Sequence, residues 1–181
     1  MVTRDVTVDA AGLQSLYLGG GTPSKLGGRG IAEVINRIAN RAGVEKFSTS
    51  RGELELTVEA NPEDVTPEAA AMWASAGVNR VSLGVQSFHP EVLEWMHRTH
   101  GQDAPGAAVQ TLRDAGIDDI SIDLIFALPG NLTRDWQKDL AQALALEPTH
   151  VSLYGLTAEP KTPLGRWTAR GPAYPSPARK R

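Results

Sequence analysis

The stretch "DISIDLIFALP", residues 119–129, decides the class of fold. Its β-branched and large apolar residues are typical of a strand, and polar residues occupy every second position of its first half. The two faces are therefore different: Ile120, Ile122 and Leu124 on one, Ser121 and Asp123 on the other. A central strand of a doubly wound sheet is covered by helices on both faces and is apolar on both. A strand with one polar face favours a barrel with polar side chains in its interior.

The same type of strand occurs five times along the chain. The strands are expected to begin near Ser15, Leu54, Arg80, Asp119 and His150. Helical patterns lie between them, at residues 30–43, 66–77, 104–116 and 133–146. Strand and helix alternating at this spacing predict βαβ units with parallel strands. Thr66 and Thr133 stand where helix N-caps belong, and a glycine stands where each of the first three helices stops.

The other strands also alternate in polarity. In "LELTVEANP" Glu55, Thr57 and Glu59 alternate with leucine and valine, and "RVSLGVQS" follows the same rule. An ordinary closed (β/α) barrel fills its interior with Val, Ile and Leu. A polar interior cannot remain dry unless its groups pair or hold a ligand. We therefore expect an α/β fold with parallel strands, a partial or wide barrel of which five βα units are visible, with a ligand inside.

Length and composition narrow the function. At 181 residues with 41% hydrophobic content, the chain is expected to form one domain over residues 1–170, followed by a flexible basic tail at 171–181. The net charge of −3 without a basic stripe argues against nucleic acid as a partner. No apolar run is long enough for a membrane span, and the first residues lack the apolar core of a signal peptide, so we expect a cytoplasmic protein.

Candidate site residues lie at the carboxyl ends of the strands, where parallel α/β folds bind ligands. They are Gly19 to Thr22, Glu59 with Asn61, Gln86 and Asp123, and each has a structural alternative. The glycines could form only a tight turn, Glu59 could pair with Arg80, and Gln86 could bond a neighbouring strand. Asp123 within an Ile/Leu strand is explained either by function or by a buried pair.

Metal binding is not favoured by the histidines or by the cysteine count. His97 and His100 are three residues apart, but no third ligand completes a recognisable set, so we interpret both as solvated. The sequence has no cysteine, which removes disulfides, thiolate metal sites and cysteine nucleophiles.

Five motifs in order carry a resemblance to a known family: "YLGGGTPS", "VEANPED", "NRVSLGVQSF", "IDLIFALPG" and "HVSLYGLTAEPKTPLGRW". Over about residues 15–167 the chain resembles the radical SAM family of oxygen-independent coproporphyrinogen III oxidases and HemW heme chaperones, and looks more like HemW. The resemblance implies a partial (β/α)₆ barrel that binds S-adenosylmethionine at its carboxyl-terminal mouth. By motif position the contacts would be Gly20, Gly21, Thr22, Glu59, Gln86, Arg98, Asp123 and, as a weaker match, Thr157. Without the resemblance, an arginine in the position of Arg98 is more often a surface residue than a ligand contact.

The chain departs from the family in one respect. Radical SAM chemistry requires a [4Fe-4S] cluster held by a Cys-x-x-x-Cys-x-x-Cys loop, and no cysteine is present. We therefore expect a fragment that lacks this loop and the C-terminal domain, is inactive alone, and self-associates through an exposed strand edge. A half with its cluster loop on another chain and a degenerate protein are alternatives.

The resemblance implies heme or a porphyrinogen as the partner of the complete protein. Coproporphyrinogen III dehydrogenase activity is the alternative to a heme chaperone. A small-molecule-binding β/α domain without catalysis is the alternative from another class.

Overall fold

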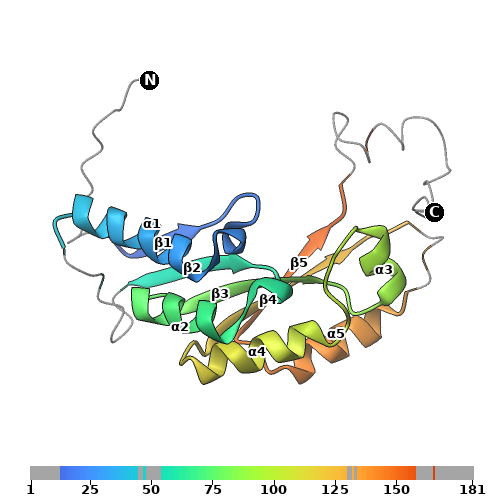
Figure 1. The fold of residues 1–181 in the computed structure, drawn as a ribbon. Coiled ribbons are helices and arrows are strands. Elements are labelled where there is room, and N and C mark those ends of the chain that lie inside the picture. Colours follow the sequence, from blue (N-terminus) through green and yellow to red (C-terminus); the bar gives the residue numbers. More distant parts are fainter. Residues whose placement is uncertain are drawn as a thin grey trace, which may run out of the picture.

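The computed structural model describes residues 13–44, 47, 54–129, 132, 134–157 and 165. Five strands alternate with helices along these residues (Figure 1). The strands are β1 (Ser15–Leu18), β2 (Glu55–Ala60), β3 (Arg80–Gln86), β4 (Asp119–Phe126) and β5 (His150–Gly155). The helices are α1 (Gly27–Arg41), α2 (Pro67–Ala76), α3 (Pro90–Trp95), α4 (Ala104–Asp114) and α5 (Trp136–Ala145), with short 3-10 turns η2 (Pro23–Leu26) and η4 (Pro62–Asp64).

The strands form one parallel sheet in the order β1-β2-β3-β4-β5, so each strand pairs with the next one in sequence. Figure 1 shows α2, α4 and α5 along one side of this sheet. The predicted α/β architecture with parallel strands is therefore confirmed. Because every crossover is a helix, all the carboxyl ends of the strands come to the same edge of the sheet.

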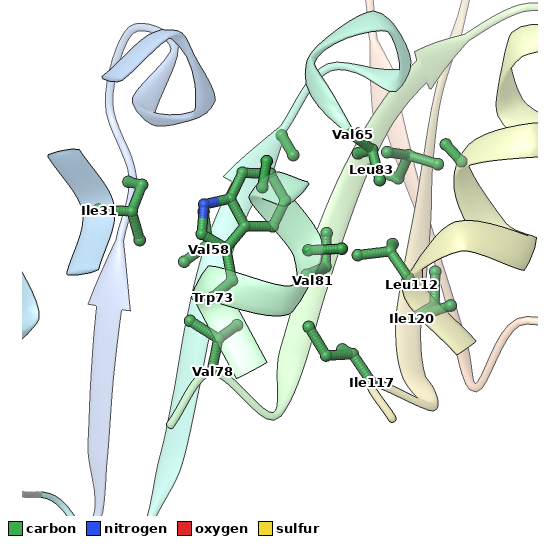
Figure 2. Packing of buried hydrophobic residues seen from close by; sticks show 14 of the residues in the cluster. Ile31, Val58, Val65, Trp73, Val78, Val81, Leu83, Leu112, Ile117 and Ile120 are labelled. Atoms are coloured by element: carbon green, nitrogen blue, oxygen red, sulfur yellow. The ribbon is translucent and has the colours of Figure 1, made fainter. Parts of the chain in front are cut away.

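The apolar face of each strand makes the core with the helices. Trp73 of α2 is fully buried and lies between Ile31 of α1 and the strand residues Val58 and Val81 (Figure 2). Further along the same layer, Leu112 of α4 packs beside Val81. Burial of a large aliphatic or aromatic side chain contributes about 1.5–3 kcal/mol, so this layer fixes which strand face turns away from the helices. The polar face is left for the site.

The ends of the helices agree with the sequence prediction at α2 and differ at α5. Thr66 caps α2 by accepting a hydrogen bond from Ala69 N at 3.1 Å, and Gly77 ends the helix in the left-handed conformation. For α5 the predicted cap at Thr133 is wrong, because Asp135 caps the helix by accepting from Lys138 N. Thr133 itself and the predicted tail at 171–181 lie outside the described residues.

Strand β3 contains an irregularity that the sequence did not indicate. Its register with β4 shifts between Leu83 and Gln86, and Gln86 has a φ of 67°. A β-bulge redirects a side chain and is common beside functional sites, where left-handed backbone at a non-glycine residue is also concentrated. This bulge places Gln86 at the carboxyl edge of the sheet.

Candidate functional site

The glycine run that follows β1 needs glycine at every position. Gly20 and Gly21 have φ angles of +87° and +71°, which L side chains rarely adopt. At Gly19 a Cβ would come within 2.5 Å of the Tyr17 ring. The predicted tight turn is therefore present. It also orients the backbone N–H of Gly20, which donates a 3.1 Å hydrogen bond to Glu59 Oε2.

Glu59 on β2 accepts hydrogen bonds from the β1 side of the site. Tyr17 donates its hydroxyl to Glu59 Oε1 at 2.8 Å, beside the bond from Gly20 N. Desolvation first, and then the hydrogen bond to Glu59, raise the pKa of Tyr17 to about 12. The alternative pairing of Glu59 with Arg80 is wrong, because the contacts of Arg80 are to Glu55 and Asp119, each at 3.6 Å. Glu59 thus fixes the glycine turn to the sheet.

Asp123 on β4 lies among serine hydroxyls. Ser82 Oγ on β3 lies 3.0 and 2.8 Å from its two carboxylate oxygens, and Ser121 Oγ lies 3.3 Å from Oδ1. Burial raises the pKa of Asp123, the serine hydrogen bonds oppose that rise, and the negative charge of Glu59 adds to it. Neutral hydroxyl donors orient the carboxylate without neutralising it, so the carboxylate remains suited to a cationic group.

Arg98 follows α3 and turns toward the sheet. It is partly buried, and its Nη1 donates a 2.9 Å hydrogen bond to Asn61 Oδ1 at the end of β2. Burial lowers the pKa of Arg98, although a guanidinium remains charged. The interpretation of Arg98 as a surface arginine is therefore wrong. It brings a positive charge into a site that otherwise has two carboxylates.

These groups line one pocket with a volume of about 430 Å³. The polar and glycine residues that line it are Gly21, Thr22, Glu59, Asn61, Ser82, Gly84, Gln86, Arg98 and Asp123. Two of the contacts expected by motif position, Gly20 and Thr157, are not part of this lining. Gly20 is connected to it by its hydrogen bond to Glu59. Thr157 is exposed, and its hydroxyl lies 3.5 Å from Gly155 O.

Sequence reasoning did not propose Ser82, Ile125 or Tyr154 as site residues, yet all three line the pocket. The polar position of Ser82 between Val81 and Leu83 was a usable signal. Ile125 gave no such signal. Tyr154 is 54% exposed, and its place beside the pocket depends on the pairing of β5 with β4.

The two histidines near Arg98 differ in burial. His97 is exposed, whereas His100 is 5% exposed and burial lowers its pKa. The interpretation of both as solvated is therefore wrong for His100. Within the described ranges, no group of three or more His, Cys, Asp or Glu could hold a metal ion. None of the helices in the described part of the chain has the length and apolar character that a membrane span requires.

The chain is similar to proteins of known name. It is 39% identical over 150 residues to the heme chaperone HemW of Lactococcus lactis, covering 83% of this chain and 38% of that protein. Against HemW of Escherichia coli the identity is 35% over 163 residues, with 90% and 41% covered. The chain thus spans about two fifths of the length of these relatives.

Among solved structures, the coproporphyrinogen III oxidase HemN of Escherichia coli, described as a radical SAM enzyme, superposes with a TM-score of 0.72 at 25% identity. The superposition covers 84% of this chain and 34% of HemN. The family model of the radical SAM superfamily matches residues 4–143. On this match, and with the parallel α/β sheet, the chain belongs to the radical SAM superfamily.

Proposed function

We propose that this chain binds S-adenosylmethionine in the pocket at the carboxyl ends of its strands. The observation that carries the proposal is the charge arrangement of that pocket: two carboxylates, Glu59 on β2 and Asp123 on β4, line the same pocket as the guanidinium of Arg98. S-adenosylmethionine offers an ammonium and a sulfonium to carboxylates and a carboxylate to a guanidinium. Its ribose hydroxyls suit the remaining amide and carboxylate acceptors.

Each element of the site would contribute a different contact to the ligand. The turn at Gly20 to Thr22 supplies backbone close to the ligand, because no Cβ at either glycine blocks the approach. Gln86 contributes an amide from the bulge of β3. Glu59 already accepts two hydrogen bonds, and a carboxylate has lone pairs for more. Arg98, anchored on Asn61, would receive the ligand carboxylate.

The superfamily also implies a [4Fe-4S] cluster, and the residues of this chain do not fit one. Such clusters are held by cysteine thiolates, and the sequence has no cysteine. No step is therefore assigned to a cluster on this chain. When bound in such proteins, the cluster supplies the electron for radical chemistry.

At the level of the complete protein, we propose a role in heme metabolism of the heme chaperone kind. The support is the similarity to HemW proteins at 32–39% identity over most of this chain. Coproporphyrinogen III oxidation is the second candidate, and the superposition on HemN favours it. Sequencing the coding DNA upstream of Met1 distinguishes these two functions from a small-molecule-binding domain without catalysis. An in-frame Cys-x-x-x-Cys-x-x-Cys supports either radical SAM role, and its absence supports a domain without radical chemistry.

Ligand-observed NMR tests the binding site. Without the chelation that a cluster provides, the affinity of the chain for S-adenosylmethionine is expected at about the millimolar range or weaker. Asp123→Ala removes a hydrogen-bonding charge and should weaken binding by about 1–3 kcal/mol, which is a loss of affinity of about 5- to 150-fold. Asp123→Asn, which keeps the shape of the side chain, should weaken binding in the same direction.

Asp118→Ala is the matched control, because Asp118 is exposed and directly precedes the amino end of the same strand. It should bind as the unchanged chain does. His97→Asn is a second control, in which asparagine tolerates the φ of 54° that this exposed position requires. If folded Asp123 variants bind as well as these controls, the assignment of the site is wrong even though the superfamily stands.

A further inference from the structure

Asp139 is a carboxylate of α5 with no exposed surface. It lies outside the pocket lining, on the helix side of the sheet, yet it is held by three donors. Ser87 Oγ donates to Oδ2 at 2.8 Å, Phe88 N donates to Oδ1 at 2.8 Å, and Arg134 Nε donates to Oδ2 at 2.7 Å. A buried carboxylate is costly unless it is paired and hydrogen-bonded, so this arrangement requires an explanation.

Asp139 bonds the residues that directly follow β3, and Arg134 connects it to β4 as well. Its Nη1 donates to the carbonyl oxygen of Ile125 on β4 at 2.6 Å, and its guanidinium carbon lies 4.4 Å from the centre of the Trp136 ring. Nη2 lies 2.7 Å from Asp139 Oδ2, off the hydrogen-bonding direction, so that contact is electrostatic. The planar guanidinium thus binds the carboxylate and the strand together, which a lysine could not do.

Both backbones in this arrangement carry residues of the pocket. Ser87 directly follows Gln86, whose φ of 67° and register shift need support from the surrounding structure. Ile125 is itself part of the pocket lining and lies two residues after Asp123. The network of Asp139 and Arg134 therefore joins the bulge of β3 to the carboxyl end of β4 from behind the site.

We propose that Asp139 and Arg134 are positioning residues: they hold Gln86 and the end of β4 in the geometry that the S-adenosylmethionine pocket requires. This inference rests on the proposed function. The ion pair gives the strained bulge two fixed hydrogen bonds, through Ser87 Oγ and Phe88 N, which an apolar packing contact could not direct. Preorganised backbone at a binding site reduces the ordering that the ligand must impose.

The test compares Asp139→Asn with Ser87→Ala in the 181-residue chain, using ¹⁵N-labelled protein titrated with S-adenosylmethionine. Asp139→Asn removes the charge with little change of shape. Ser87→Ala removes the hydrogen bond to Asp139 and the one that the hydroxyl accepts from His89 N, while keeping the ion pair. The NMR signal of the Gln86 side-chain amide is identified by its loss in Gln86→Glu. Its chemical shift reports the geometry of the bulge in β3 before any ligand is added. Both variants should shift that signal and weaken binding, Asp139→Asn by at least tenfold and Ser87→Ala by severalfold.

Asp119→Asn is the matched control, because Asp119 also faces an arginine, Arg80, but at the opposite end of β4. It should leave both the Gln86 signal and the affinity unchanged, whatever it does to the melting temperature. If Asp139→Asn does not fold, Ser87→Ala decides by itself. A folded variant with an unshifted Gln86 signal and an affinity within twofold of the unchanged chain overturns the inference. Failure of the unchanged chain to bind refutes the proposed function instead, and the Gln86 signal still tests the positioning.

Discussion

At Asp123 the protonation equilibrium reports how the pocket is built. Burial raises its pKa, and the hydroxyl of Ser82 limits that rise by donating a hydrogen bond to the carboxylate. A pKa that is higher in the folded than in the unfolded chain means that the folded state binds the proton more tightly. The resulting contribution to stability is fully present below the unfolded value of about 3.8 and is lost as pH rises through the folded value.

Ser82→Ala should therefore raise the pKa of Asp123 further, because the carboxylate loses the donor that most favours its charged form. The ¹³C chemical shift of the carboxyl carbon, followed against pH, measures this directly. Ser75→Ala on the exposed side of α2 is the control and should leave the titration unchanged. An unaltered titration in Ser82→Ala would mean that the two side chains are not in contact in solution.

At the scale of the elements, helix α2 is stabilised by its N-cap Thr66, which the sequence predicts. Thr66→Ala should lower the free energy of unfolding by about 1 kcal/mol, because the Ala69 N–H loses the side-chain oxygen that accepts from it. Urea denaturation measures the change. Thr22→Ala is the matched comparison: Thr22 precedes η2 without making a cap hydrogen bond, so the free energy of unfolding should be unchanged. Equal losses in the two variants would contradict the capping argument.

At the scale of the whole molecule, the sheet has two outer strands within the described residues. The sequence predicts association through β1, and the structure adds β5, where Leu153 and Tyr154 are 49% and 54% exposed. Outer strands with exposed apolar side chains favour intermolecular pairing. The chain should self-associate at tens of micromolar by light scattering, and Leu153→Lys should reduce association more than Ser15→Lys does. A monodisperse monomer of the unchanged chain would refute the prediction.

The absence of cysteine from the whole chain predicts that it cannot bind an iron-sulfur cluster. Anaerobic reconstitution of the purified chain with iron and sulfide should give no stoichiometric [4Fe-4S] cluster, because carboxylates and histidines are poor substitutes for thiolates at such sites. Electron paramagnetic resonance of the reduced sample is the measurement. A four-iron signal near one per chain would show that other ligands suffice.

The sequence by itself determined the parallel sheet, its polar face and many of the polar residues that line the pocket. The alternation of Ile120, Ser121, Ile122 and Asp123 has a period of two, which separates the faces of a strand before any tertiary contact forms. Likewise the glycine run could be interpreted locally, since left-handed backbone at Gly20 and Gly21 is a property of those residues themselves. Local rules of this kind do not need the folded chain.

Only the tertiary structure decided which partner each polar group takes. Glu59 bonds Tyr17 rather than Arg80, and Arg98 turns inward to Asn61, because the register of neighbouring strands and the direction of α3 set which groups meet. The bulge at Gln86 and its support from Asp139, fifty-three positions later, are likewise invisible in sequence. The physical reason is that hydrogen bonds and ion pairs depend on distances of a few ångströms between segments far apart in the chain, and only packing of the whole sheet fixes those distances.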